Sequence, residues 1–148
     1  MAFLSAFDIC ASGMTAQRLR LDVASQNVAN IQTTRTEGGE TYRRKMVVFQ
    51  AADDSFRSVM RRTMNRGRDG ERNAGVIVTQ IVDDETEMQM VYNPEHPDAD
   101  ENGYVTMPNV DLIKETTDAM AATRSYQANI TAFNAIKLMA QKALEIGK

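Results

Sequence analysis

The chain lacks tryptophan and contains only one cysteine and one histidine, Cys10 and His96. A single cysteine cannot form an intramolecular disulfide, and a closed zinc site usually needs several Cys or His ligands. A nucleophilic Cys–His pair would depend on chance proximity of these two distant residues. The sequence therefore predicts no catalytic residues, no metal site and no bound cofactor. Cys10 is interpreted as a small buried apolar residue.

Long apolar runs are also missing, since no stretch approaches the roughly 18 apolar residues that a membrane-spanning helix needs. Residues 1–16 form an apolar start, but the first basic residue is Arg18 and Asp8 interrupts the run. A cleaved secretory signal has a basic leading segment and an uninterrupted apolar region. We therefore expect that, if the protein leaves the cytoplasm, it keeps its N-terminus.

The chain has no excess of basic residues, and its net charge is −3 with a pI near 5.2. Nucleic-acid-binding domains are usually basic, so no nucleic-acid partner is expected. The motifs G-x-x-x-x-G-K-[ST], G-x-G-x-x-G and G-x-S-x-G are absent. These absences predict a protein that is not an enzyme and has no small-molecule substrate. His96, Asp98 and Asp100 are interpreted as part of a rigid turn rather than as metal ligands.

Both ends of the chain carry long helical patterns, in which apolar positions alternate in steps of three and four, the spacing of a coiled-coil seam. In the second pattern, from about 110 to 146, a further apolar line widens the face, which suggests more than one neighbouring helix. Pro108 and Asn109 are expected to stop the preceding segment and to cap this helix. The first seam, from about 3 to 31, consists of Phe3, Phe7, Cys10, Met14, Gln17, Leu21, Ala24, Val28 and Ile31.

The middle of the chain has a different composition. Residues 42–50 and 75–82 are rich in Val and Ile and predict strands, and residues 87–92 form a weaker candidate. Residues 51–74 contain six arginines and are interpreted as an exposed loop, whereas residues 83–101 are acidic and contain no Lys or Arg. The predicted fold class is α+β, with long terminal helices that pair like a coiled coil around a small β-rich insert. The expected segments are an N-terminal axial helix at 1–33, the insert at 34–108 and a C-terminal axial helix at 109–148.

An insert of this size is too small to cover two long apolar helices. We expect neighbouring subunits to cover the remaining apolar surface, so the pattern predicts polymerisation through the terminal helices. Two alternatives stay open: a soluble helical adaptor that binds one partner, and a small hydrolase that uses the acidic turn.

Several segments resemble a known family. The sequence SQNVAN at residues 25–30, followed by TT at 33–34, resembles the N-terminal signature shared by flagellar rod, hook and hook-associated proteins. RSYQAN at 124–129 is similar to the C-terminal helix motif of the same family. YRRK at 42–45 and NPEHPDAD at 93–100 resemble its basal-body rod branch.

The resemblance implies a structural subunit of the proximal rod, the drive shaft of the flagellar basal body outside the cytoplasmic membrane. It implies export through the flagellar type III apparatus without signal cleavage. The implied partners are further copies of the chain, other rod proteins and the basal-body membrane ring. The residues expected at the assembly interface are Phe3, Phe7, Met14, Leu21, Asn27, Val28, Asn30, Met120, Tyr126, Asn129, Ile130, Phe133 and Ile136.

Four polar residues within this set have alternative interpretations. Asn27 and Asn30 share a helix face, and their amides can bind either carbonyls at the helix end or a neighbouring subunit. Tyr126 and Asn129 either fix the register of packed helices or belong to an ordinary helix surface.

Overall fold

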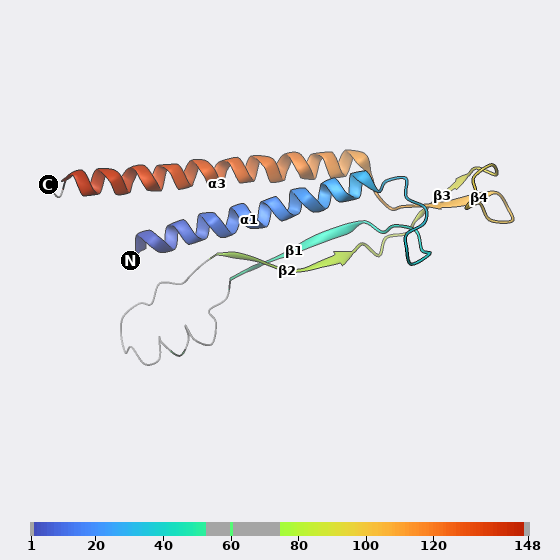
Figure 1. Cartoon of the computed structure of the whole chain (residues 1–148), viewed down its shortest axis with the longest axis horizontal. Coiled ribbons are helices and arrows are strands. Elements are labelled where there is room, and N and C mark those ends of the chain that lie inside the picture. The colour runs from blue at the N-terminus through green and yellow to red at the C-terminus, as the bar shows by residue number, and fades with distance from the viewer. Residues whose placement is uncertain (1, 53–59, 61–74, 147–148) are drawn as a thin grey trace. The chain divides into compact units, whose positions relative to one another are not determined.

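The computed structural model describes residues 2–52, 60 and 75–146 of the 148-residue chain. Within these residues, two long helices flank four short strands along the sequence, which confirms the predicted α+β class (Figure 1). Most of the Arg-rich loop predicted at 51–74 lies outside the described residues. The elements are α1 (Ala2–Ala29), β1 (Lys45–Ala51), β2 (Val76–Asp83), β3 (Gln89–Tyr92), β4 (Tyr104–Met107) and α3 (Leu112–Ile146).

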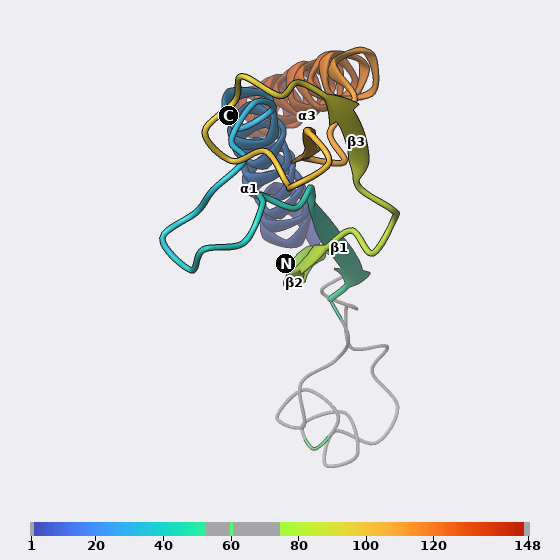
Figure 2. The ribbon, with the colours of Figure 1, turned by 90° about the vertical axis from the view of Figure 1, so that its right-hand side faces the viewer.

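The strands form two separate two-stranded sheets, β1–β2 and β3–β4 (Figure 2). The three strands expected from the sequence are present within about three residues of their predicted bounds. The fourth strand, β4, was not predicted. Its four residues are too few to display a convincing alternation, and it becomes a strand by pairing antiparallel with β3.

The chain divides into two compact units, and each helix contributes to both. The first unit consists of residues 1–18, 49–79 and 123–148, and the second of residues 19–48 and 80–122. Both units therefore combine helix with insert, whereas the sequence suggested three consecutive segments. That three-segment division stays a prediction about independent folding.

In the first unit, α1 and α3 pack antiparallel. The rings of Phe7 and Phe133 meet edge to face, with centroids 4.8 Å apart. Farther along, Gly13 faces Asn129, and a Cβ atom at Gly13 would lie only 3.1 Å from Asn129 Nδ2. Cys10, between these contacts, and Ala16, one turn beyond Gly13, are buried, which confirms the predicted burial of Cys10. Small residues thus let the two helices approach closely.

In the second unit, the core is formed largely by small and β-branched residues. The buried face of α1 includes Val23, Ala24 and Asn27, whereas Leu21 and Val28 of the predicted seam are only half-buried. The buried face therefore coincides with the predicted seam at Ala24 and departs from it at Val23 and Asn27, because α1 contacts the insert as well as α3. Among the described helices, none combines the length and apolarity that crossing a bilayer requires.

Helix α3 begins directly after Asp111, which is its N-cap. The carboxylate of Asp111 accepts a hydrogen bond from the N–H of Ile113 at 2.8 Å, and its carbonyl accepts the N–H of Glu115 at 3.0 Å. The expectation that Asn109 caps this helix is wrong. Asn109 lies too far before the first turn, and its side chain binds the insert instead.

The β3–β4 hairpin depends on a glycine at its turn. Gly103 has φ +77°, and a Cβ atom there would lie 2.9 Å from Tyr92 Cε2 and 3.2 Å from Pro94 Cβ. Gly39 has a similar φ of +82°, but nothing lies within 4 Å of the corresponding Cβ position. Replacement of Gly39 therefore tests only the free-energy cost of the left-handed backbone. Replacement of Gly103 tests that cost together with the steric contact.

We predict that Gly39→Ala lowers the free energy of unfolding by about 1–2 kcal/mol, the cost of a left-handed non-glycine residue. Gly103→Ala should cost at least about 1 kcal/mol more, because it also displaces the Tyr92 ring. Urea unfolding of both variants, with hydrogen exchange of the β3–β4 amides, measures the difference. Equal losses in the two variants would contradict the steric role of Gly103.

Candidate functional site

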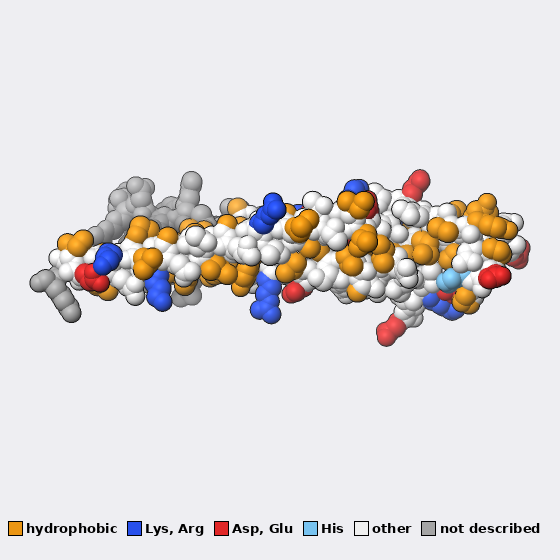
Figure 3. All heavy atoms as spheres, turned by 90° about the horizontal axis from the view of Figure 1, so that it is seen from above, with side chains coloured by type: hydrophobic (Ala, Val, Ile, Leu, Met, Phe, Trp, Pro, Cys, Tyr) orange, Lys and Arg blue, Asp and Glu red, His pale blue; other side chains and the backbone are white. Residues whose placement is uncertain are grey.

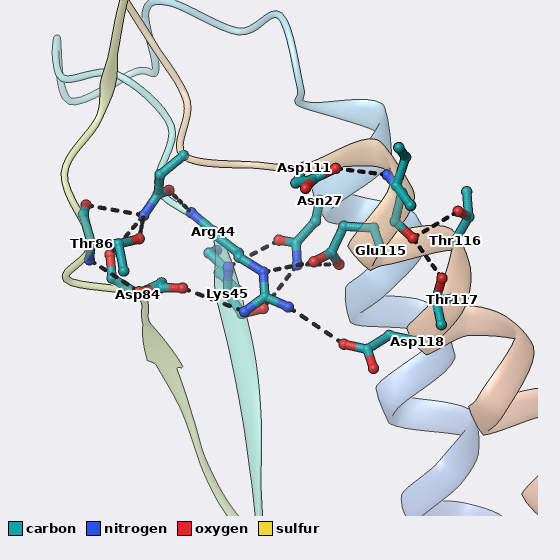
Figure 4. A network of polar contacts seen from close by, with 12 residues as sticks. Asn27, Arg44, Lys45, Asp84, Thr86, Asp111, Glu115, Thr116, Thr117 and Asp118 are labelled. Atoms are coloured by element: carbon teal, nitrogen blue, oxygen red, sulfur yellow. Dashed lines mark hydrogen bonds and ion pairs between the residues drawn. The ribbon is translucent and has the colours of Figure 1, made fainter.

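A buried polar network in the second unit joins α1, the insert and α3, and Asn27 lies at its centre (Figure 4). Asn27 Nδ2 donates hydrogen bonds to the carbonyl of Lys45 and to Glu115 Oε2, both at 2.9 Å. Asn27 Oδ1 accepts hydrogen bonds from the Tyr42 hydroxyl and from the N–H of Lys45, both at 2.9 Å. Asn27 is 1% exposed. Its amide therefore reaches its full hydrogen-bonding capacity within the chain.

Arg44 provides the positive charge that balances this network. Its Nε lies 2.6 Å from Glu115 Oε1, and its two terminal nitrogens lie 3.4 Å from Asp84 Oδ2 and from Asp118 Oδ2 (Figure 4). Asp118 also pairs with Arg20 of α1 at 2.8 Å. Glu115 is only 1% exposed, so its carboxylate depends on Arg44 and Asn27 to replace the lost hydration.

A second polar centre, at Asn109, attaches the same region to the strand connection. Its Oδ1 accepts the N–H of Arg44 at 2.8 Å, and its Nδ2 donates to the Thr86 hydroxyl at 2.9 Å and to the Asp84 carbonyl at 3.1 Å. The N–H of Asp84 donates to the Arg44 carbonyl at 2.7 Å. The backbone around Arg44 is thereby held on both sides, which fixes where its guanidinium points.

The environment shifts three ionisation equilibria. Burial raises the pKa of Tyr42, and the charges of Asp83 and Glu115 raise it further, so its hydroxyl stays protonated and donates to Asn27. Burial acts to lower the pKa of Arg44, but Glu115 and Asp84 outweigh it and the pKa ends above its usual value. The N–H of Thr86 lowers the pKa of Asp84; burial opposes this, and the Thr86 hydroxyl and Arg44 reinforce it.

In this arrangement Arg44 and Arg20 pair with Asp84, Glu115 and Asp118, so the charged groups hold one another in place. This is the chemistry of a structural link between segments. We use "the clasp" for Asn27, Tyr42, Arg44, Lys45, Asp84, Glu115 and Asp118. Within the described residues, no group of three or more His, Cys, Asp or Glu side chains has a metal-binding arrangement.

The proposed turn around His96 is held by one local hydrogen bond and one to a distant segment. His96 Nδ1 accepts the N–H of Asp98 at 3.1 Å, and the Thr34 hydroxyl donates to Asp98 Oδ2 at 2.8 Å. These bonds match its interpretation as a turn. The bond from Thr34 also connects the segment after α1 to the turn between β3 and β4.

The residues expected at an assembly interface fall into several structural classes. Phe7, Met14, Leu21, Val28, Phe133 and Ile136 are half-buried within the chain, and Met120, Tyr126 and Ile130 are exposed on α3. Phe3 lies in α1, but its side chain is outside the described part. Their role in assembly stays a prediction.

The three asparagines of that set have contacts inside the chain. Asn30 Nδ2 donates to the Gln26 carbonyl at 2.9 Å, which is the local alternative considered for this residue. Asn129 Nδ2 donates to the Ser125 carbonyl at 3.0 Å while its side chain lies over Gly13. For Asn27 the structure supplies a third role, an internal link between three segments.

Sequence reasoning missed Tyr42 as a partner of Asn27. It also missed the pairing of Arg44 with Glu115 and Asp84. One signal was available, because Glu115 lies three residues after Leu112 and four before Ala119, in the three–four spacing of the C-terminal helical pattern. A charge there requires a cationic partner, but spacing alone does not show which of the arginines provides it.

We predict that Asn27→Ala lowers the free energy of unfolding by about 3 kcal/mol or more, because it leaves several buried donors and acceptors without partners. The matched control is Asn30→Ala, which removes an amide with local contacts and should cost about 1 kcal/mol or less. Urea denaturation followed by circular dichroism measures both. A loss of similar size in the two variants would contradict the central role of Asn27.

A pH dependence follows from Asp84. Because its pKa is lowered in the folded state, its contribution to stability is present above the usual carboxyl range and is lost as the pH falls through about 4 toward the folded pKa. Asp84→Asn lacks this contribution. The stability difference between the unmodified chain and Asp84→Asn should therefore shrink on acidification.

Urea unfolding at a series of pH values between about 6 and 3 tests this expectation. Glu101→Gln, at an exposed position, controls for the loss of one negative charge. A stability difference for Asp84→Asn that stays constant across this range would rule out the proposed linkage.

Comparison with known proteins gives the family. The chain is 47% identical to the flagellar basal-body rod protein FlgC of Bacillus subtilis and 40% identical to that of Salmonella typhimurium, with complete coverage of both chains in each case. It is 37% identical to FlgC of Borreliella burgdorferi over 99% of this chain and 98% of the relative. The family described as "Flagella basal body rod protein" matches residues 7–35, and that described as "Flagellar basal body rod FlgEFG protein C-terminal" matches residues 101–146. The chain therefore belongs to the FlgC family of flagellar basal-body rod proteins.

Proposed function

We propose that this protein is a structural subunit of the flagellar rod and that it polymerises through its terminal helices. The single observation that carries the polymerisation proposal is the exposure of α3. Of its 35 residues, only Glu115 and Ala122 are buried. The exposed large apolar residues of this helix are Leu112, Ile113, Met120, Tyr126, Ile130, Leu138, Met139, Leu144 and Ile146.

The energetic reason is the size of this uncovered surface. Complete burial of one Leu, Ile or Met side chain contributes about 1.5–3 kcal/mol. A helix with several such side chains exposed gains much more from contact with further helices than from remaining in water. The face extends beyond the surface that contacts α1, so more than one neighbouring helix can be accommodated.

The internal contacts support a role in transmitting torque. Phe7 with Phe133 and Gly13 with Asn129 fix the register of α1 against α3 in the first unit. In the second unit, Arg20 with Asp118 and Asn27 with Glu115 do the same. Helices whose register is fixed by both packing and hydrogen bonds resist sliding along each other.

The finer assignment concerns location and partners. We infer that the chain belongs to the proximal part of the rod and contacts copies of itself, other rod proteins and the membrane ring. We also infer export through the flagellar type III apparatus with its N-terminal segment retained. The similarity to FlgC relatives over the full chain supports these inferences.

We predict that Leu138→Asp abolishes incorporation into the rod, because an unpaired charge would be buried between packed helices. Leu138 is 60% exposed in the isolated chain, so its replacement should leave the fold intact. Phe133→Asp is a less specific change, because it also removes the contact with Phe7. Sedimentation at increasing protein concentration and swimming of cells that carry the variant measure the effect.

The matched control is Gln141→Asp, which adds the same charge at an exposed polar position of α3. Circular dichroism of the two variants checks that both helices remain. Normal assembly and swimming with Leu138→Asp would contradict polymerisation through this face. A chain that remains monomeric at all concentrations and binds a single other protein would instead favour an adaptor.

A further inference from the structure

The two faces of the β3–β4 hairpin differ in exposure. Its register pairs Val91 with Val105 and Tyr92 with Tyr104, so alternate residues point to opposite sides. Val105 is 2% exposed, whereas Met90 is 71% and Tyr92 is 64% exposed. Val91, on the same side as Val105, is 46% exposed, so that side is buried only along β4. Met90, Tyr92 and Tyr104 are exposed on the other side, which we call the open face.

This open face is held in a defined shape. The rings of Tyr92 and Tyr104 meet edge to face with centroids 5.3 Å apart. The Tyr92 ring also lies against Gly103, where the absence of a side chain makes room for it. The N–H of Asn93 donates to the Gly103 carbonyl at 2.9 Å and closes the hairpin behind the rings. Aromatic side chains that are exposed and already ordered are typical anchors of protein interfaces.

The surroundings of the face are strongly acidic. Residues 83–107 contain eight Asp and Glu and no Lys or Arg. Of these acids, Glu87, Glu95 and Glu101 are exposed next to β3 and in the turn between the strands. Arg35 lines a shallow pocket with Asp98 and Asp100 and offsets part of this charge. Figure 3 shows apolar and acidic side chains next to one another on the surface, with a few basic side chains among them.

A partner for this face must therefore combine apolar side chains with positive charge. The same amino-acid sequence contains such a segment. Residues 57–68 include five arginines and no acidic residue, with Val59, Met60 and Met64 among them. Arginine can also place its guanidinium over a tyrosine ring.

We propose that the open face of the β3–β4 hairpin binds the Arg-rich segment 57–68 of a neighbouring copy of this chain. The contact is separate from the helix-mediated assembly and rests on the proposed function only in that it needs a second copy. It gives each subunit both an acidic apolar face and its basic counterpart. Such a head-to-tail contact can repeat along an assembly.

Cross-linking between two differently marked chains tests the contact. One chain carries Cys10→Ala with Met90→Cys, and the other carries Cys10→Ala with Met60→Cys. A short thiol-specific cross-linker applied to the mixture should give the mixed dimer. Met46→Cys in place of Met90→Cys is the matched control, because Met46 is an exposed methionine on β1, outside the hairpin, and should give a several-fold lower yield.

Ionic strength and a charge exchange make the test specific. Raising salt from about 0.1 M to about 1 M shortens the screening length from about 10 Å to about 3 Å and should lower the yield several-fold. Arg61→Glu with Arg62→Glu on the chain that carries Met60→Cys should lower the cross-linking yield similarly. Glu87→Lys with Glu95→Lys on the chain that carries Met90→Cys should do the same. Combining the two pairs of changes should restore the yield.

The same mixtures made in the Leu138→Asp background separate this proposal from the helix-mediated one. Sedimentation reports whether the helices still assemble, and cross-linking reports the hairpin contact independently. A salt-sensitive cross-link in either background supports the proposal. The proposal is overturned if no cross-link forms in either background, or if the combined charge changes fail to restore it. It is also overturned if a chain that carries both cysteines cross-links to itself at high dilution.

Discussion

The hydrogen bonds of the Asn27 amide are the constraint on which the rest of the second unit depends. They join α1 to the start of β1 and to the first turn of α3, three segments that are distant in sequence. Apolar packing alone would hold them loosely, because many buried apolar residues of the chain are as small as Ala24 and Ala122. A fully satisfied polar group in the interior favours one arrangement strongly, since any slip leaves donors or acceptors unpaired. The pairing of Arg44 with Glu115 then depends on the position that Asn27 fixes.

Because polar bonds and small residues hold the chain together, the large apolar residues of α3 remain available for other contacts. Small residues and polar bonds connect the two helices within the chain, as Gly13 with Asn129 and Asn27 with Glu115 illustrate. Residues such as Leu138 and Leu144 stay exposed. A rod subunit benefits from this division, because surface that is not needed for the subunit's own fold remains free to join subunits. The hairpin adds an acidic apolar face of different chemistry at another position.

Much of the architecture could be predicted from periodicity. The seven-residue patterns gave both helices, and the Val- and Ile-rich runs gave β1 and β2. The prediction was wrong where a tertiary contact overrode a local signal. Asn109 has the chemistry of an N-cap, but Asp111 takes that position and Asn109 binds Arg44 and Thr86. The strand β4 exists because β3 pairs with it, and four residues carry too little pattern to predict that pairing.

The sequence by itself determined the two helical ends, the small insert, the segregation of acidic and basic segments, and the excess of apolar surface on the C-terminal helix. These properties follow from residue type and spacing along one strand or helix, which neighbouring residues fix locally. Only the tertiary structure decided the partners of Asn27, the choice of Arg44 to neutralise Glu115, and which face of the β3–β4 hairpin stays open. Those outcomes depend on contacts between residues far apart in the sequence. The same local patterns are compatible with several tertiary arrangements. The one that forms is the one that satisfies every buried donor, acceptor and charge together.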